Sequence, residues 1–229
     1  MTKYYEHRGI TIYHGDCRET IRALGPSLVA DLVLTDPPYN ASNSAVDFAE
    51  KGFSAVDEKW DKDFKIDFVS EAWGALSATG SMLVFCSYHL LRDYLTWQKP
   101  RQIVHWHKAN PFPAIAKVYT PSTEYVLWWT KGSPYTFNKS FAGVDYITTP
   151  ICAGNERTEH PTQKPLTLIQ QLLTVHAPER GLVLDCFMGS GTTLRAAKDL
   201  GLKAIGVEIE EKYCEIAARR LEQEVFDFN

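Results

Sequence analysis

The 229-residue sequence contains no run of about 18 apolar residues, and its first residues, MTKYYEHRG, lack the apolar core of a signal peptide. We therefore expect a soluble protein that lies in the cytoplasm and has no membrane contact. Cysteine is scarce and scattered, since none of the five cysteines forms a C-x-x-C pair. This spacing excludes a disulfide framework and a zinc ribbon, so we expect buried or free thiols. The cysteines are Cys17, Cys86, Cys152, Cys186 and Cys214.

The chain also lacks an overall excess of positive charge, because its net charge is −4. This value argues against a protein that coats nucleic acid without specificity. The charge is uneven, however: residues 99–139 hold six Lys or Arg and one acid, Glu124, whereas the rest of the chain holds 18 bases and 27 acids. Such a segment can attract an anion, although an ordinary solvated surface has the same composition.

The sequence alternates short apolar runs with helical patterns, and 45% of its residues are hydrophobic. Most of the runs are continuous, as in strands that are buried on both faces. The alternation predicts one α/β domain over residues 1–229, a three-layer sandwich with a mostly parallel sheet of seven strands. The predicted strands are residues 10–14, 31–36, 81–86, 103–107, 124–129, 182–187 and 203–208. The predicted helices are residues 66–77, 89–98, 165–177, 192–201 and 211–225.

Two long segments interrupt this alternation. Residues 40–65 are small, polar and acidic without a clear period, and they predict a mobile loop. Residues 132–163 are rich in Gly, Pro, Thr and aromatic residues. Because unstructured segments of this length in a compact domain are usually functional or disordered, we expect the second one to be an insert that recognises a target.

The stretch LVLTDPPYN runs an apolar strand into an acid, two prolines and an aromatic ring. Proline has no backbone N–H and restricts the residue before it, so the strand must stop at Asp36. The stiff peptide that follows would hold Asp36 and Tyr39 in fixed relative positions, as a functional site requires. A strand-ending loop with a solvated Asp and a packed Tyr explains these residues equally well.

A second motif, LVLDCFMGSGTTLRAAKDLGLKAIGVE, has the order strand, glycine turn, helix, strand. Gly189 and Gly191 allow a tight turn and the close approach of a ligand, and the helix that opens near Thr192 presents free N–H groups. The next strand ends at Glu208, where an acid can accept both hydroxyls of a ribose. The lysine of a phosphate-binding P-loop is missing, so we interpret the motif as a nucleotide site, with an ordinary turn as the alternative.

TDPPYN and LDCFMGSGTT together resemble the S-adenosylmethionine-dependent DNA amino-methyltransferases that methylate N6 of adenine or N4 of cytosine. TDPPYN precedes the glycine motif, which resembles the permuted order called the beta class. Similar segments extend over nearly the whole chain: HGDC (14–17), HWHKANPFP (105–113), TEYVLWWTKG (123–132), EHPTQKP (159–165) and VEIEEKYCEIAARRL (207–221). The resemblance implies a Rossmann-like methyltransferase fold with seven strands. The family often has Pro where this chain has Cys186.

The resemblance also implies catalytic roles for the DPPY residues. Asp36 and the carbonyl of Pro37 would accept the two hydrogens of the target amine, Pro38 would stiffen the peptide, and Tyr39 would stack on an extruded base. Adenine is the expected target because Asp precedes PPY, although cytosine presents the same two hydrogens. The expected enzyme is thus a site-specific adenine-N6 DNA methyltransferase that acts on a flipped-out nucleotide.

The implied cofactor is S-adenosylmethionine, with S-adenosylhomocysteine as product and no metal. Asp16 would contact its adenine, Glu208 its ribose, and the turn from Phe187 to Thr192 its methionine portion, with Asp185 near the methionine amino group. Thr162 and Lys164 would border the same pocket. The cofactor-binding residues implied are Asp16, Cys17, Asp36, Thr162, Lys164, Asp185, Phe187, Gly189, Ser190, Gly191, Thr192, Glu208 and Ile209.

The implied partner is double-stranded DNA in the cytoplasm of a bacterium, or of a phage-infected one, in association with the nucleoid. A homodimer and a cognate restriction endonuclease stay open, as do RNA or a small amine as substrate and a non-catalytic DNA-binding role. Lysines in the basic segment are candidates for phosphate contacts, and Phe112 is a candidate wall of the base pocket. The DNA-binding candidates are Lys108, Phe112, Lys117, Lys131 and Lys139.

Overall fold

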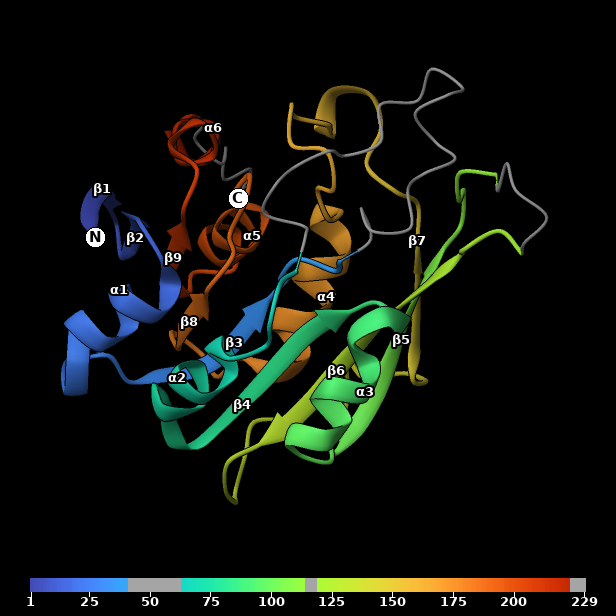
Figure 1. The fold of residues 1–229 in the computed structure, drawn as a ribbon, viewed down its shortest axis with the longest axis horizontal. Helices are drawn as coiled ribbons and strands as arrows, with labels where there is room; N and C mark the ends of the chain where they lie inside the picture. The colour runs from blue at the N-terminus through green and yellow to red at the C-terminus, as the bar shows by residue number, and fades with distance from the viewer. Residues whose placement is uncertain (41–62, 114–118, 223–229) are drawn as a thin grey trace.

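The computed structural model describes residues 1–40, 63–113 and 119–222, which form one nine-stranded sheet with helices on both faces (Figure 1). The strands are β1 (Thr2–His7), β2 (Ile10–His14), β3 (Ala30–Thr35), β4 (Leu76–Cys86), β5 (Gln102–Lys108), β6 (Thr123–Thr130), β7 (Tyr146–Thr149), β8 (Leu182–Asp185) and β9 (Lys203–Glu208). The helices are α1 (Cys17–Leu24), α2 (Phe68–Gly74), α3 (Tyr88–Trp97), α4 (Leu166–His176), α5 (Thr192–Asp199) and α6 (Glu211–Glu222). Two short 3-10 helices are η1 (Gly25–Ser27) and η5 (Gly154–Glu156).

The strand order is β1-β2-β9-β8-β3-β4-β6-β5-β7. The five central strands, from β2 to β4, are parallel, and β7 is parallel to β5. β1, β6 and β5 run antiparallel to their neighbours β2, β4 and β6. The sheet is therefore mostly parallel, as the sequence predicted, with its antiparallel pairings towards the two sides.

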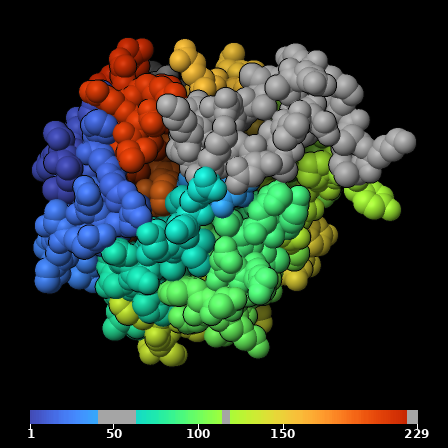
Figure 2. All heavy atoms as spheres, viewed as in Figure 1, coloured from blue at the N-terminus to red at the C-terminus, as the bar shows by residue number. Residues whose placement is uncertain are grey.

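Two hydrophobic cores cover the two faces of the sheet, because neighbouring strand residues point to opposite faces. In β3, Leu32 and Leu34 pack in the core beneath α4, α5 and α6, whereas Val33 packs in the core beneath α1, α2 and α3. In Figure 1, α2 and α3 lie in front of the sheet and α4 lies behind it. Figure 2 shows α2 and α3 in the lower part of the front face and α6 at its upper left. The predicted three-layer sandwich is confirmed.

The prediction of seven strands was wrong, because the described residues contain nine. All seven predicted strands are present at or near their predicted positions. The two additional strands, β1 and β7, lie at the two edges of the sheet and are largely exposed. A strand that buries little has no continuous apolar run, so the pattern that identified the central strands could not detect these two.

The parallel strands bring their carboxyl ends to one edge of the sheet. β3 ends at Thr35 and its neighbour β8 ends at Asp185, and the chain leaves these two strands in opposite directions, towards β4 and β9. Ligands of open α/β sheets bind at such a reversal, outside the carboxyl ends of the strands. The functional site is thus expected between the DPPY peptide and the glycine turn.

Most of the predicted loop at 40–65 and the predicted phosphate contact Lys117 lie outside the described residues. The two ends of that loop meet, since the Asn40 amide donates to the Phe64 carbonyl at 3.0 Å and accepts from its N–H at 2.7 Å. All five cysteines are buried free thiols. Across the described part of the chain, no helix is long and apolar enough to cross a membrane. Residues 1–40, 63–113 and 119–222 contain no group of three or more His, Cys, Asp or Glu that could hold a metal ion.

Candidate active site

The ends of β3 and β8 are tied together by hydrogen bonds. The Thr35 hydroxyl donates to the Asp185 carboxylate at 2.8 Å, and it accepts from the N–H groups of Cys186 and Phe187 at 3.1 and 3.2 Å. All of these groups are buried or nearly so. The DPPY peptide and the glycine turn, which are about 150 residues apart in sequence, therefore leave the sheet side by side.

Four charged side chains and a tyrosine form a compact cluster at this edge. The Lys164 ammonium lies 2.5 Å from Asp36 Oδ2 and 3.2 Å from Glu124 Oε2, and the Lys108 ammonium lies 2.8 Å from Glu124 Oε1. The exposed fractions of these side chains are 7% for Lys164, 15% for Glu124, 19% for Lys108 and 22% for Asp36. Two cations and two carboxylates alternate, so each poorly solvated charge has an opposite partner, as such charges require. We call Asp36, Tyr39, Lys108, Glu124 and Lys164 the charged cluster.

Tyr39 closes this cluster between the two acids. Its hydroxyl lies 2.7 Å from Asp36 Oδ1 and 2.8 Å from Glu124 Oε2, so its single proton is donated to one carboxylate at a time. The Lys164 ammonium lies 5.0 Å from the centre of its ring. Burial and the two acids hold the pKa of Tyr39 well above its ordinary value, so the hydroxyl stays protonated.

The two carboxyls of the cluster have pKa values shifted in opposite directions. Burial raises the pKa of Asp36, opposed by the Lys164 charge and reinforced by that of Glu124. Burial would also raise the pKa of Glu124, but Lys164 and Lys108 together outweigh it and lower the value to about 2. Glu124 is therefore ionised at neutral pH, whereas Asp36 is the member of the pair that takes up a proton more readily.

A cavity of about 390 Å³ lies beside the cluster, within the size range of small-molecule sites. Its walls come from the carboxyl ends of β3, β8 and β9 and from the segment before α4. Of the residues expected to bind the cofactor, those that line it are Asp16, Cys17, Asp36, Thr162, Lys164, Asp185, Phe187, Gly189, Ser190, Thr192, Glu208 and Ile209. Gly191 does not line it; of the DPPY residues, Asp36 and Pro38 do, and Pro37 and Tyr39 do not.

The glycine turn has the close contacts that only glycine permits. Gly189 and Gly191 have φ angles of 50° and 76°, in the left-handed region. A Cβ atom on Gly189 would lie 2.7 Å from His160 Nε2, and one on Gly191 would lie 2.7 Å from the Cβ of Ala217. Gly191 therefore serves to pack α5 against α6, which explains why it lies behind the cavity wall. Arg220 supports the turn from α6 by donating to the Ser190 carbonyl at 2.7 Å.

Two buried acids face the cavity, and burial raises the pKa of both. The Glu208 carboxylate accepts from the N–H groups of Gly189 and Glu210 at 2.9 and 2.8 Å, and its pKa rises to about 7. The pKa of Asp185 rises to about 6. These two carboxyls are thus poised to ionise near neutral pH, when a partner for the charged form arrives.

Asp16 has a structural role that the sequence analysis did not include. It is the N-cap of α1, where its Oδ1 accepts from the Arg18 N–H at 2.8 Å, and its Oδ2 lies 2.6 Å from the Arg18 guanidinium. The side-chain hydrogen bond from Arg18 lowers the pKa of Asp16 against the effect of burial. Both carboxylate oxygens are therefore already engaged at the wall of the cavity.

The cavity has an aromatic wall that the sequence motifs did not predict. Phe64 and Phe68 lie 5.5 and 4.8 Å, ring centre to ring centre, from Phe187, both edge to face. All three residues line the cavity. Only Phe187 belongs to a recognised motif, whereas the other two come from the end of the predicted loop and from α2.

Glu124 was also missed, although it has a signal in the sequence. It is the only acid among six bases in residues 99–139. Its sequence neighbours are apolar or small, in the run TEYVLWW, and a lone acid at the start of an apolar strand requires a partner if it is buried. The partners, Lys108 and Lys164, were each named for another role, and no local pattern pairs either of them with Glu124.

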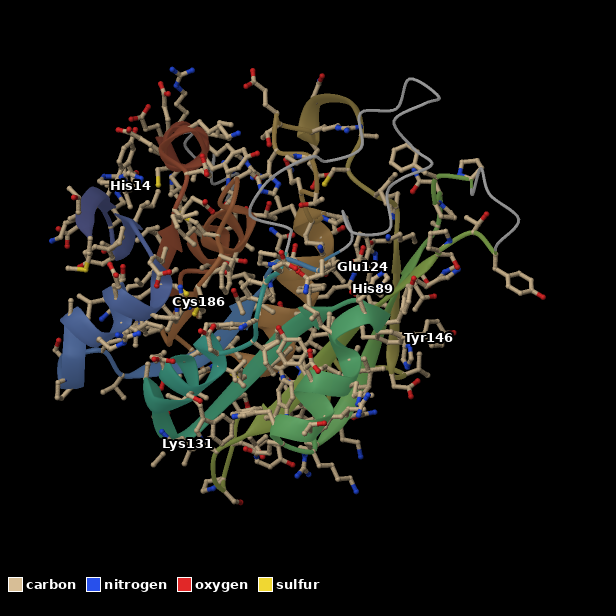
Figure 3. The ribbon with its side chains drawn as sticks, in the orientation of Figure 1. His14, His89, Glu124, Lys131, Tyr146 and Cys186 are labelled. Atoms are coloured by element: carbon tan, nitrogen blue, oxygen red, sulfur yellow. The ribbon has the colours of Figure 1, made fainter. Side chains whose placement is uncertain are left out.

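The structure separates the residues expected to contact DNA. Lys108 belongs to the charged cluster, and Phe112 is 61% exposed. Glu124 is the second residue of β6 and Lys131 follows the last one, so the two residues lie at opposite ends of this strand (Figure 3). At the usual rise of a strand, they are about 23 Å apart along β6. The Lys131 ammonium donates to the carbonyls of Trp73 and Leu76 at 3.0 and 2.8 Å, at the carboxyl end of α2.

Lys139 also lies away from the cavity. The N–H of its neighbour Asn138 donates to the carbonyl of Val175, in the last turn of α4, whereas the other end of α4 follows Lys164. An α-helix of this length is about 16 Å long. Lys131 and Lys139 therefore both lie away from the cavity and the charged cluster.

Comparisons with known proteins agree with this geometry. Solved structures of DNA methyltransferases share the fold: an M1.HpyAVI–SAM complex superimposes with a TM-score of 0.71 at 32% identity, covering 92% of this chain and 99% of that one. The cytosine-N4-specific PvuII DNA methyltransferase superimposes with a TM-score of 0.75 at 17% identity, over 96% of this chain and 88% of that one, which shows likeness of fold alone. The fold and the site thus define a Rossmann-like methyltransferase.

The sequence comparisons identify the family within this class. The N6/N4 family described as DNA methylase matches residues 30–219. The type II methyltransferase M.HinfI of Haemophilus influenzae is 30% identical over 93% of this chain and 68% of its own length. The type II methyltransferase M2.LlaDCHI of Lactococcus lactis subsp. cremoris is 30% identical over 96% of this chain and 93% of its own length. The chain belongs to this family, so the prediction of an S-adenosylmethionine-dependent DNA amino-methyltransferase is confirmed.

Proposed function

We propose that this protein transfers the methyl group of S-adenosylmethionine to N6 of an adenine that is flipped out of double-stranded DNA. The observation that carries the proposal is the adjacency of two motifs. Asp36 lines the same cavity as Gly189 and Glu208, so an amine held by Asp36 lies beside a ligand held by the glycine turn. A site with these two parts brings an acceptor and a methyl donor together, which is the main requirement of a transfer between two bound molecules.

The residues of the cavity fit the proposed cofactor. Glu208 offers a carboxylate for the ribose hydroxyls, and Asp185 offers one for the methionine amino group. Phe64, Phe68 and Phe187 offer an apolar wall for the adenine ring. When bound, S-adenosylmethionine supplies an electrophilic methyl group on a sulfonium centre.

The role proposed for the DPPY peptide follows from the chemistry of the amine. The lone pair of an exocyclic amine is delocalised into the ring, so the nitrogen must pyramidalise before it attacks. Asp36 and the Pro37 carbonyl accept its two hydrogens, favour that geometry and stabilise the positive charge that develops on nitrogen. A carboxylate has about four lone-pair sites, so Asp36 keeps acceptor capacity beside its bonds to Lys164 and Tyr39.

The Tyr39 ring is proposed to complete the base site. Extrusion of the nucleotide costs a few kcal/mol, and stacking on the Tyr39 ring returns about 1–3 kcal/mol of it. The methylated amine then carries a positive charge, and Asp36, whose pKa is raised by burial, accepts the proton that it releases. The choice of adenine over cytosine rests on the Asp before PPY.

The segment 132–163 is proposed to read the DNA sequence. Its described residues include exposed apolar side chains, with Phe141 66%, Val144 65% and Tyr146 55% exposed. This segment also supplies β7, which extends the sheet beyond β5 on the side of the charged cluster. A homodimer and a cognate restriction endonuclease remain predictions from the family.

The test is to incubate the protein with methyl-labelled S-adenosylmethionine and unmethylated duplex DNA of mixed sequence, digest the DNA to nucleosides, and identify the labelled base by mass spectrometry. Label on N6 of adenine is expected. Label on N4 of cytosine would overturn the choice of base and leave the mechanism intact. Absence of label from DNA, with cofactor binding demonstrated separately by calorimetry, would overturn the proposed reaction.

A further inference from the structure

Glu124 is the acid of the charged cluster to which the proposed mechanism gives no role. It is the second residue of β6 and pairs with Trp106 of β5 in the sheet, so its backbone position is fixed. Its side chain is 15% exposed, and both of its oxygens are bound. Oε1 faces Lys108, whereas Oε2 lies between the Lys164 ammonium and the Tyr39 hydroxyl. Figure 3 shows Glu124 at the edge of the sheet where β4 ends.

We propose that Glu124 is a positioning residue for methyl transfer: it holds the Lys164 ammonium and the Tyr39 hydroxyl where they orient the Asp36 carboxylate towards the target amine. Both groups contact Asp36 and Glu124 at once, so they are bridges between the two acids. The inference rests on the role proposed above for Asp36. It adds a residue that does not touch the substrate and acts through two that touch Asp36.

The geometry explains why the site needs a second acid. Without Glu124, the Lys164 ammonium would be attracted to Asp36 alone, and this closer pair would compete with the amine for the same oxygens. With Glu124 in place, the attraction of Lys164 is divided between two carboxylates at 2.5 and 3.2 Å. Tyr39 is likewise shared, which sets the tilt of the ring that is proposed to stack on the base. A displacement of catalytic groups by about 1 Å can lower a rate about 100-fold.

Lys108 anchors Glu124 from the other side. Its ammonium is bound to Glu124 Oε1 and lies 5.3 Å from the centre of the Trp106 ring. Removal of Lys108 would leave the whole charge of Glu124 to Lys164, so Lys164 would neutralise Asp36 less. Changes at Glu124 and at Lys108 therefore act on Asp36 in opposite directions.

The pKa of Asp36 depends on the charges that surround it. The ionisable groups that face Asp36 come from five elements: Tyr39 after β3, Glu124 on β6, Lys164 before α4, Asp185 at the end of β8 and Tyr94 on α3. Loss of the Glu124 charge removes a group that raises the pKa of Asp36 and frees Lys164 to lower it further. The pKa of Asp36 must then fall. Loss of Lys108 makes it rise.

The experiment compares Glu124→Gln and Lys108→Met with the wild type. Methyl transfer is measured in single turnovers with saturating DNA and S-adenosylmethionine, as a function of pH. The fall of the rate at low pH, called the acid limb below, then reports a pKa in the complex of enzyme, DNA and cofactor. Dissociation constants for S-adenosylmethionine are measured on the same samples. The control is Glu6→Gln, which neutralises an exposed glutamate of β1 in a similar ion pair, with Lys3.

For Glu124→Gln we expect a 10- to 100-fold lower maximal rate, roughly as for a misplaced catalytic group. Its acid limb should move to lower pH, and that of Lys108→Met to higher pH, with cofactor affinity within about twofold of the wild type for both. The Glu6→Gln control should match the wild type. A loss of folding stability would either lower the rate without moving the limb or move the limb of both variants to higher pH, so it cannot produce shifts in opposite directions.

Two results would overturn the inference. One is a wild-type rate and limb for Glu124→Gln, and the other is a lower rate for both variants with the acid limb unmoved, which would mean that Glu124 only stabilises the fold. A wild-type protein that leaves adenine unmethylated would instead overturn the proposed function, so the two failures are distinguishable.

Discussion

The Lys164 ammonium lies 2.5 Å from Asp36 Oδ2, although the two residues are 128 positions apart in the sequence. This contact joins the DPPY peptide to the EHPTQKP segment, two motifs that belong to different parts of the chain. An ion pair this well buried neutralises both groups, and removal of one partner leaves a charge without compensation unless another partner is near. Glu124 is that other partner for Lys164, so Asp36 can be replaced without leaving Lys164 alone.

We expect Asp36→Ala to abolish methyl transfer while cofactor binding survives. The substitution removes an acceptor for the target amine, and the glycine turn and Glu208 remain. The measurements are methyl incorporation into DNA and calorimetric binding of S-adenosylmethionine. Glu6→Ala, at an exposed position of β1, is the control for a lost carboxylate. Turnover near that of the wild type in Asp36→Ala would refute the role given to this residue.

The affinity for S-adenosylmethionine should rise with pH through neutrality. Burial raises the pKa of Glu208 to about 7, and the ionised form is the one that accepts the ribose hydroxyls. Below that pH the carboxyl is protonated and accepts poorly. For a single group with this pKa, the affinity should increase about tenfold between pH 6 and pH 8, as measured by calorimetry.

Glu208→Gln is the matched variant for this pH dependence. Gln cannot ionise, so the variant should bind the cofactor more weakly, and the increase centred near pH 7 should disappear. A smaller increase near pH 6 should remain, because burial raises the pKa of Asp185 to about 6. If the variant kept the wild-type increase, another group would have to be responsible.

We expect Gly189→Ala to weaken cofactor binding and to destabilise the fold by about 2–5 kcal/mol. The left-handed backbone accounts for about 1–2 kcal/mol of this, and crowding of the added Cβ against His160 for about 1–3 kcal/mol. Gly201→Ala is the control, since Gly201 has a φ of 67° but no atom within 4 Å of an added Cβ. Urea unfolding measures both variants.

The double variant Gly189→Ala/His160→Ala separates strain from crowding. His160 Nε2 is the atom nearest to the added Cβ, at 2.7 Å. Gly189→Ala is expected to lose more stability than Gly201→Ala, and removal of the His160 imidazole should restore this difference. No recovery in the double variant would show that crowding by His160 does not contribute.

Lys131→Met should lower the free energy of unfolding by about 1 kcal/mol and leave DNA affinity unchanged. Its ammonium binds carbonyls at the carboxyl end of α2, where a cation is favourable. Lys139→Met is the control, because Lys139 is exposed and also lies away from the cavity. Urea unfolding and fluorescence anisotropy on a DNA duplex at several salt concentrations test both. A smaller salt dependence of binding in Lys131→Met would mean that Lys131 contacts phosphate.

Local patterns in the sequence were sufficient where local forces decide. The central strands were predicted because a strand buried on both faces needs a continuous apolar run, and the end of β3 was predicted because prolines cannot continue a ladder. Helix α1 was missed, although Asp16 caps it and Glu19 follows three residues later, which is the pattern of a capping box. The edge strand β1 was missed because most of its residues are exposed.

The sequence by itself determined the class of fold, the two motifs, and with them the family. Only the tertiary structure decided which charges meet. Lys108, Glu124, Lys164 and Asp36 come from four segments, and their contacts depend on the strand order that places β6 and β5 beyond β4. The extended backbone of β6 places Lys131, which follows the last residue of that strand, at the other end of the strand from Glu124. Hydrophobic periodicity is a local property of the chain, whereas the pairing of buried charges depends on distances in space between residues that the chain itself keeps apart.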